Sequence, residues 1–441
     1  MVTVSPRRWL ILPLEIKARE LHAKMLLALV AAERGWGVIV GDKLATRGAR
    51  DVLPRGTFLE KSIQPGREAS IFKAIGVGHR VSTTCEEGLL YLQKDYYKER
   101  RISRPAFDAI DYFFAWGTRH AEDVDDGSGK VVSSGNPRMD VLRPEWRDVF
   151  MPAARRIQER YGKIILVNSR FPVVSHALPS LLNVRHGAAP TGDNEQIWRR
   201  YVALQGELFP YFLGVLPRLS ETFPEHTIVV RPHPAENPTP WLERAGELSN
   251  VKVIYEGSAN EWILASDVAI QNNCFTGVEA YLLDKPSISY RPFRDEGVEV
   301  ALTNQVGLQA CSEDELITCL QRVIRGEEDV PGLYLRQRDG VRRYVSNLDG
   351  ALACEAFMDA FDRLDLPVSS GRFPIPRRMK DALRSLRTLF SPIKAYSRQK
   401  FPGIDLVEVQ QILHSFQEAS DRFTDVEIVP STAGGFCVYR P

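Results

Sequence analysis

A proline-stiffened turn, Arg231-Pro232-His233-Pro234, follows a short apolar run. The two prolines restrict the backbone, so the imidazole of His233 is held in one direction. Arginine supplies positive charge and histidine can donate a proton near neutral pH, which together suit a phosphate or a phosphate ester. We therefore expect Arg231, His233 and Pro234 to handle the phosphate of a bound nucleotide. A structural turn with a hydrogen-bonded histidine is the alternative.

A second polar segment, residues 271–280, also follows an apolar run and precedes a helical pattern. Small and polar residues at a helix start leave backbone N–H groups and the positive end of the helix dipole for an anion. We expect Asn273, Thr276 and Gly277 to contact the donor phosphate, and Glu279 to bind ribose hydroxyls. The alternative is a plain helix cap, because Thr276 and Glu279 have the spacing of a capping box.

Two adjacent carboxylates, Glu86 and Glu87, follow the predicted strand 80–84 and precede a helix expected over 87–100. Either carboxylate could act as the general base that takes a proton from an acceptor hydroxyl. The alternative is a pair of acids in the first turn of a helix, where the dipole favours them.

Further candidates lie at the ends of other predicted strands and are equally compatible with turn or capping roles. Those on the expected acceptor side are Glu15, Arg19, Gly88, Asn136 and Arg138, and Ser169 lies on the donor side.

The elements that must position these residues alternate between short apolar runs and longer helical patterns, which is typical of parallel α/β sheets. Two such series occur, and we expect two facing Rossmann-like domains with an inter-domain cleft. The predicted domains are 1–150 for the acceptor and 151–365 for the nucleotide sugar, followed by a basic extension over 366–441. Ligands of such sheets bind beyond the carboxyl ends of the strands. The long irregular stretch 171–194 is expected to be a functional loop, and a long amphipathic helix is expected over 195–222.

Composition sets further bounds. The chain has 441 residues, 44% hydrophobic and 26% charged, with a net charge of +1, so no nucleic-acid partner is indicated. Six cysteines without a CxxC pair favour neither disulfides nor zinc, and we expect a cytoplasmic protein. The apolar run 9–14 is too short for a signal peptide and is expected to be a buried strand. No acidic run typical of a nucleotide-bound metal follows a strand, so we predict no metal and no cofactor.

Residues 372–400 interleave basic and apolar side chains. This pattern is typical either of a solvated helix that packs on the body of the protein or of a peripheral contact with an anionic membrane.

Taken in order, these motifs resemble the bacterial surface-carbohydrate biosynthesis proteins of GT-B type, which are akin to sialyltransferase-like and Kdo-transferase-like enzymes. The resemblance covers most of residues 8–365. It implies that the acidic pair before Gly88 supplies the general base and that His233-Pro234 contacts the nucleotide phosphate. The related motif often begins with aspartate where this chain has Cys85, so which acid is the base stays open.

The resemblance implies transfer of a sugar from a CMP-activated donor, such as an ulosonic acid, to a glycan or lipid-linked glycan acceptor. Inversion of the anomeric centre would follow from a single displacement, although a retaining route through a carboxylate adduct is also chemically open. Three rivals predict different behaviour: a polyol-phosphate transferase that uses CDP-glycerol, a non-catalytic scaffold of a polysaccharide assembly complex, and a sugar-nucleotide epimerase.

Overall fold

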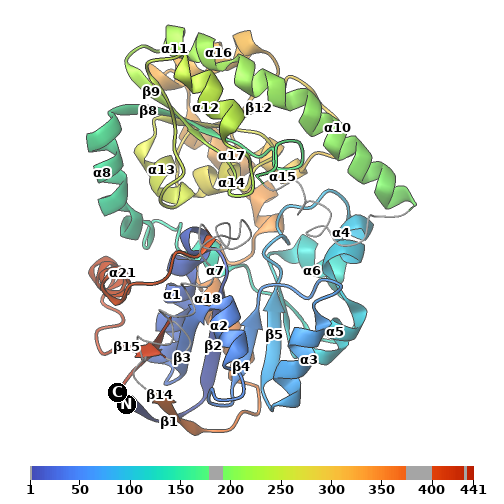
Figure 1. Ribbon diagram of the computed structural model, residues 1–441, viewed down its shortest axis with the longest axis vertical. Coiled ribbons are helices and arrows are strands. Elements are labelled where there is room, and N and C mark those ends of the chain that lie inside the picture. The colour runs from blue at the N-terminus through green and yellow to red at the C-terminus, as the bar shows by residue number, and fades with distance from the viewer. Residues whose placement is uncertain (1, 178–191, 374–399, 432–434) are drawn as a thin grey trace. The chain divides into compact units, whose positions relative to one another are not determined.

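The computed structural model describes residues 2–177, 192–373, 400–431 and 435–441, which form two compact units (Figure 1). The first unit comprises residues 1–88, 101–141 and 345–441, and the second comprises 89–100 and 142–344. These divisions differ from the predicted boundaries, since residues 345–365 and the C-terminal segment belong to the first unit.

The first unit is built on an eight-stranded sheet in the order β15-β16-β3-β2-β4-β5-β6-β7. Strands β2 to β7 are parallel, and helices α1, α7 and α18 cover one face while α2, α3 and α5 lie on the other (Figure 1). The elements of this unit are β1 (Val2–Arg7), β2 (Trp9–Leu14), α1 (Lys17–Glu33), β3 (Gly37–Asp42), α2 (Lys43–Gly48), β4 (Thr57–Glu60), α3 (Glu68–Gly76), β5 (Arg80–Thr84), α5 (Arg104–Ala109), β6 (Phe113–Ala115), α6 (Thr118–Val124), β7 (Val131–Ser133), α7 (Pro137–Asp140), α18 (Ala353–Phe361), β14 (Ser369–Phe373), α21 (Leu406–Ala419), β15 (Glu427–Ser431) and β16 (Gly435–Tyr439).

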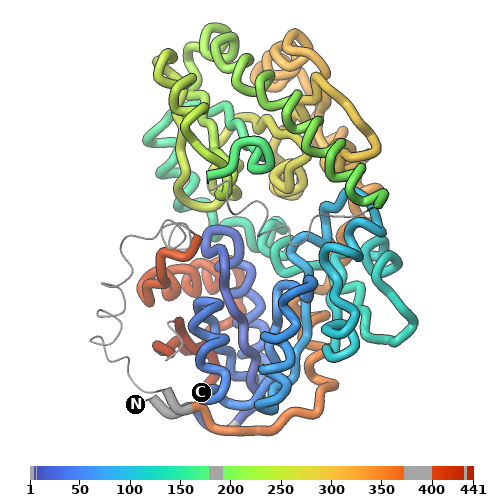
Figure 2. The backbone as a smooth tube through the Cα atoms, turned by 45° about the vertical axis from the view of Figure 1, so that its right-hand side comes forward, coloured from blue at the N-terminus to red at the C-terminus, as the bar shows by residue number. Residues whose placement is uncertain are grey.

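The C-terminal segment is part of this sheet. Strand β16 pairs antiparallel with β3, β15 pairs with β16, and α21 packs beside α1 (Figure 2). The expectation of a separate extension over 366–441 is therefore wrong for residues 400–431 and 435–441, because the edge of β3 is satisfied by these strands. The predicted basic helix lies almost wholly outside the described residues.

The second unit contains a six-stranded parallel sheet in the order β10-β9-β8-β11-β12-β13. Helices α10, α11, α12 and α16 cover one face and α8, α13 and α14 the other (Figure 1). Its elements are α4 (Lys94–Arg101), η1 (Arg147–Phe150), α8 (Met151–Tyr161), β8 (Lys163–Asn168), α10 (Asp193–Gly214), α11 (Leu216–Thr222), β9 (His226–Arg231), α12 (Thr239–Gly246), β10 (Val251–Val253), α13 (Ala259–Ala265), β11 (Val268–Gln271), α14 (Phe275–Leu282), β12 (Ser287–Tyr290), α15 (Ala301–Gln305), β13 (Leu308–Ala310), α16 (Glu313–Ile324) and α17 (Val330–Tyr344).

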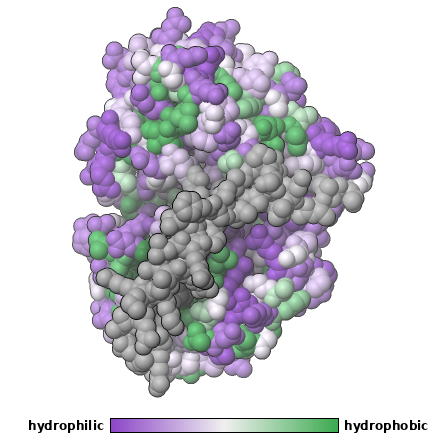
Figure 3. Space-filling model, in the orientation of Figure 1, coloured by the Kyte–Doolittle hydropathy of each residue, from purple (hydrophilic) through white to green (hydrophobic). Residues whose placement is uncertain are grey.

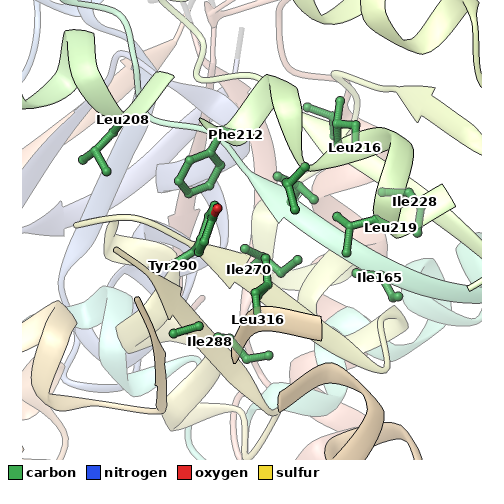
Figure 4. Close-up of a cluster of buried hydrophobic side chains, with 14 of the residues drawn as sticks. Ile165, Leu208, Phe212, Leu216, Leu219, Ile228, Ile270, Ile288, Tyr290 and Leu316 are labelled. Atoms are coloured by element: carbon green, nitrogen blue, oxygen red, sulfur yellow. The ribbon is translucent and has the colours of Figure 1, made fainter. Parts of the chain in front are cut away.

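The core of the second unit lies between its sheet and the helices α10, α11 and α16. Figure 4 shows Phe212 of α10 against Tyr290 of β12, with ring centroids 5.2 Å apart, and Leu316 of α16 near Ile288. The surface seen over α11 and α16 in Figure 3 is mainly hydrophilic, as expected for helices that bury one face.

Two local expectations differ from the structure, and a third lies mostly outside the described residues. The helix expected over 87–100 begins only at Lys94, because residues 86–90 form turns. The helix expected over 195–222 is divided at Val215, next to Pro217, whose missing N–H cannot continue the hydrogen-bond pattern. Most of the predicted functional loop, residues 178–191, lies outside the described residues. Within the described residues no helix is both long and apolar enough to cross a membrane.

Candidate functional site

In the sheet of the second unit, the direction in which the chain adds strands reverses between β8 and β11. The chain runs from β8 outward to β9 and β10, then returns to the other side of β8 as β11, β12 and β13. In open parallel sheets the loops at such a switch point diverge and leave room for a ligand beyond the strand ends. Asn168 ends β8 and Gln271 ends β11, so the segments 168–170 and 272–276 both start at this point.

The loop after β11 is fixed by its own side chains. Gln271 Oε1 accepts a hydrogen bond from the Cys274 N–H at 2.9 Å, and Asn273 Oδ1 accepts one from the Val300 N–H at 3.1 Å. Asn273 has φ 45°, in the left-handed region that asparagine tolerates better than most residues. The conformation of this loop is therefore set before any ligand arrives.

Several buried polar atoms at this strand edge have no hydrogen-bond partner among the described residues. They are Asn168 Nδ2, Asn272 Oδ1, Asn273 Nδ2 and Thr276 Oγ1. The three asparagines are each no more than 4% exposed. A buried polar atom left unpaired costs about 1–3 kcal/mol. Their concentration at one switch point indicates a polar ligand that would satisfy them.

The start of α14 differs from the plain helix cap considered above. The helix begins at Phe275, the N-cap position is Cys274, and no side chain caps it. Thr276 lies inside the first turn and forms no capping box with Glu279, which is buried in the same helix. Gly277 is required by packing, because a Cβ there would lie 2.9 Å from Nε2 of Gln271.

Arg170, rather than Arg231, brings positive charge to the switch point. Its Nη1 donates to the backbone carbonyl of Asn273, which joins the loops after β8 and β11. Arg231 instead donates to the carbonyls of Glu256, at 2.6 Å, and Gly257, at 3.2 Å. Burial lowers the pKa of Arg231 to about 10. Arg231 therefore supports the loop after β10, and its expected contact with a phosphate stays a prediction.

A buried carboxylate that the sequence analysis did not select, Glu236, organises the loops after β8 and β9. Oε1 accepts from Ser169 Oγ at 2.5 Å and from Trp241 Nε1 at 2.7 Å. Oε2 accepts from the N–H groups of Phe171, at 3.1 Å, and His233, at 3.2 Å. Burial raises the pKa of Glu236 against the opposing effect of these donors. The hydroxyl of Ser169 therefore donates to Glu236, and its expected contact with the nucleotide stays a prediction.

The half-buried ring of His233 has a defined tautomer. Its Nδ1 accepts a hydrogen bond from the Ala235 N–H at 3.1 Å, so the neutral imidazole carries its proton on Nε2. The segment that carries His233 is held as expected, and Glu236 holds it together with the two prolines.

In the first unit, the predicted acidic pair divides into two environments. Glu86 is buried, and its Oε2 lies 3.5 Å from Nη1 of Arg138, whereas Glu87 is exposed. Gly88 packs on His120 so closely that a Cβ would lie 2.1 Å from the ring. Gly88 is therefore required by packing.

The other predicted acceptor residues of the β7 end hold segments together. Asn136 Oδ1 accepts from the Arg138 N–H at 2.9 Å, and its Nδ2 donates to Thr84 Oγ1 at 3.3 Å, which ties the ends of β5 and β7. Asp140 accepts from the N–H groups of Ala353 and Cys354 at 2.9 and 2.8 Å, so it anchors the start of α18. These contacts favour the turn and capping roles.

Glu15 and Arg19 lie at the carboxyl end of β2. Glu15 forms ion pairs with Lys43 at 2.6 Å and Lys61 at 2.8 Å, and Arg19 Nη2 lies 3.7 Å from Glu20. Among the described residues, no group of three or more histidine, cysteine, aspartate or glutamate side chains could hold a metal ion. Metal independence stays a prediction.

No protein-family model matches the chain, and no curated protein matches it. Two solved structures of the wall teichoic acid polymerase TagF, one of a variant and another of TagF, each superpose with a TM-score of 0.50 at 11% identity. The matches span 87% and 82% of this chain, respectively, and 91% of the TagF chain in both cases. A UDP-GlcNAc 2-epimerase from Neisseria meningitidis bound to UDP-GlcNAc gives a TM-score of 0.49 at 15% identity over 81% of this chain and 99% of its own. The likeness to TagF shows the GT-B fold that the sequence predicts.

Proposed function

We propose that the second unit binds the nucleotide of an activated donor at the β8–β11 switch point, and that the protein is a transferase of bacterial surface-glycan assembly. The observation that carries this proposal is the group of unpaired buried atoms of Asn168, Asn272, Asn273 and Thr276 at that point. Beside them lie the positive charge of Arg170 and the uncapped first turn of α14, both of which favour an anionic phosphate.

The chemistry of transfer needs a group that stabilises the departing phosphate. The acceptor oxygen bonds to the transferred carbon while the bond from that carbon to the phosphate oxygen breaks, so negative charge grows on the phosphate. Arg170 and the first N–H groups of α14 would stabilise this charge. His233 would donate a hydrogen bond from its Nε2–H to a phosphate oxygen, because its neutral tautomer carries the proton there. Because we propose a single displacement at the transferred carbon, the configuration of the anomeric centre inverts.

The proton of the acceptor hydroxyl goes to a carboxylate of the first unit. We assign this role to Glu87, because its carboxylate is exposed while that of Glu86 is paired with Arg138. A Glu87→Gln variant should then lose transfer and keep nucleotide affinity. Loss of transfer in Glu86→Gln alone would assign the base to Glu86.

The proposed donor is a CMP-activated sugar such as an ulosonic acid, on the basis of the order of the sequence motifs. A second candidate, transfer of polyol phosphate from CDP-glycerol, is favoured by the shared fold with a wall teichoic acid polymerase. Both candidates use a cytidine nucleotide and release CMP, but they differ in the group transferred, because only the second transfers a phosphate.

The test is a thermal-shift screen of CMP, CDP, UMP, UDP and GDP, followed by incubation with CMP-sugars or CDP-glycerol and detection of released CMP, with and without a chelator. We expect stabilisation by cytidine nucleotides and transfer that survives the chelator. A preference for UDP or GDP would overturn the cytidine donor. A His233→Ala variant that folds normally and supports full-length glycan in cells would favour the scaffold.

A further inference from the structure

A second switch point, in the first unit, carries a cluster of charged residues. Glu15, Lys43 and Lys61 are the first residues after β2, β3 and β4, which are adjacent parallel strands in the order β3-β2-β4 (Figure 1). The chain passes from β2 to β3 on one side and then to β4 on the other, so the loops diverge between β2 and β4. This is the position at which open sheets of this kind bind ligands.

Three ammonium groups share a single carboxylate in this cluster. Lys43 Nζ lies 2.6 Å from Glu15 Oε2, Lys61 Nζ lies 2.8 Å from the same atom, and Lys400 Nζ lies 3.7 Å from Oε1. The lysine side chains are only 9%, 14% and 10% exposed, in that order. Although burial opposes it, the charges of Lys61 and Lys43 hold the pKa of Glu15 well below its usual range.

A second carboxylate at this strand end, Glu20, is likewise shared among several cations. It lies 3.4 Å from Lys24, 3.7 Å from Arg19 and 3.7 Å from Lys61. Arg19 also has a buried Nε without a hydrogen-bond partner among the described residues. Partly buried ammonium groups that lie close together repel one another, so an anionic ligand would stabilise this arrangement. Burial lowers the pKa of Lys43 to about 8, which is a sign of the cost of holding a charge there.

The type of cation indicates which class of anionic ligand the cluster would bind. A carboxylate is best matched by the planar fork of arginine, whereas ammonium groups act as point charges that suit the oxygens of a phosphate. We propose that Lys43, Lys61 and Lys400 bind a phosphate group of the acceptor, so the acceptor is a phosphate ester. This inference rests on the proposed transferase function, whose donor site lies in the other unit.

The C-terminal segment completes this site. It docks on the first unit through β16, through α21 beside α1 (Figure 2), and through an ion pair of 2.5 Å between Lys17 and Glu408. This docking brings Lys400 to Glu15. The segment therefore supplies a ligand-binding residue in addition to two strands of the sheet.

The probes are inorganic phosphate and sn-glycerol 3-phosphate, titrated calorimetrically into the full chain after the donor site has been saturated with CMP. Lys61→Gln and Lys400→Gln should each weaken binding of glycerol 3-phosphate by about tenfold or more. Glu15→Gln should strengthen it by about fivefold or more, because a competing charge is removed. Lys17→Gln removes a lysine that tethers the same segment outside the cluster, and should leave the affinity unchanged.

The outcomes separate the two proposals. If CMP binds but neither phosphate probe does, or if all four variants bind the probes equally well, the phosphate site is wrong and the donor site stands. If the probes bind with the predicted order of variants but no nucleotide binds, the phosphate site stands and the proposed transferase function fails. Because Glu15→Gln is expected to strengthen binding, general unfolding cannot imitate the predicted pattern. Equal weakening by Lys17→Gln and Lys400→Gln would show that Lys400 acts only by docking the segment.

Discussion

Replacing Glu236 with glutamine tests whether this carboxylate organises the candidate donor site. Its two oxygens accept hydrogen bonds from Ser169, Trp241, Phe171 and His233. In the variant, the new amide N–H₂ must face two former donors. The best arrangement places the amide N–H₂ at the former position of Oε1, because the Ser169 hydroxyl there can turn and accept a hydrogen bond. Only the Trp241 N–H is then left unpaired.

The magnitude follows from that arrangement. One buried unpaired donor costs about 1–3 kcal/mol, and the remaining bonds lose the contribution of the negative charge. We expect Glu236→Gln to lower the free energy of unfolding by about 2–4 kcal/mol. Trp241→Phe removes the unpaired N–H, so the double variant should be more stable than the sum of the single changes by about 1 kcal/mol or more.

The assay is differential scanning calorimetry of the two single variants and the double variant, with nucleotide affinity measured by titration. Glu243→Gln is the matched control, because Glu243 is an exposed residue of α12, the helix that carries Trp241, and should be neutral. Nucleotide affinity should fall by about tenfold in Glu236→Gln, since the loop that carries His233 loses its support. Strict additivity in the cycle, or a variant as stable as the original chain, would refute this account of the carboxylate.

Three further predictions concern packing and pH. Asp140→Asn should lower the unfolding free energy by about 1–3 kcal/mol, because one of the two α18 N–H groups loses its acceptor; scanning calorimetry measures this, and no change would contradict the anchoring role. Gly88→Ala should destabilise by a similar or larger amount of about 2–4 kcal/mol through its clash with His120, and an unchanged Tm would show that the loop can move away. Burial lowers the pKa of His120 from 6.5 to about 3, so the unfolded chain binds the extra proton and stability falls as pH drops below 6.5, by about 1.4 kcal/mol per pH unit. Urea unfolding from pH 7.5 to 5 should show a shallower pH slope for His120→Asn than for the original chain, and equal slopes would contradict this.

The sequence predicted most of the parallel strands, because the central ones are short apolar runs whose residues are buried. The predicted strand 9–14 is β2, with every residue buried, the predicted strand 80–84 is β5, and the apolar run before residue 271 lies within β11. Strand β4 was missed because its four residues begin with Thr57 and end with Glu60, which interrupt the apolar pattern. Yet β4 is the strand that brings Lys61 beside Glu15.

The donor motif was placed correctly at a strand end, but the partners of its side chains depend on tertiary contacts. The direction of Arg231 is set by carbonyls of residues 256 and 257, which no local pattern reveals. Glu236 lies two residues after Pro234, and its burial depends on Trp241 and Ser169 reaching it from other segments. The only sign of Glu236 in the sequence was an acidic residue close to the turn that contains His233.

The C-terminal segment was the least predictable part. Its strand β16 belongs to the sheet only because β3 offers an open edge, and Lys400 approaches Glu15 across 385 positions of sequence. Contacts of this range leave no trace in periodicity or spacing. The predicted inter-domain cleft stays a prediction.

The central claim, that the β8–β11 switch point binds a nucleotide, is tested most directly by the affinity of an Asn273→Asp variant for CMP. Aspartate tolerates the same backbone angle and keeps the Oδ atom that accepts from Val300, but it replaces the unpaired Nδ2 donor with negative charge. We predict a loss of affinity of about 100-fold, with an unchanged affinity in Asn347→Asp, the same change at another left-handed asparagine in the first unit. Equal affinity of the original chain and Asn273→Asp for CMP would contradict the claim.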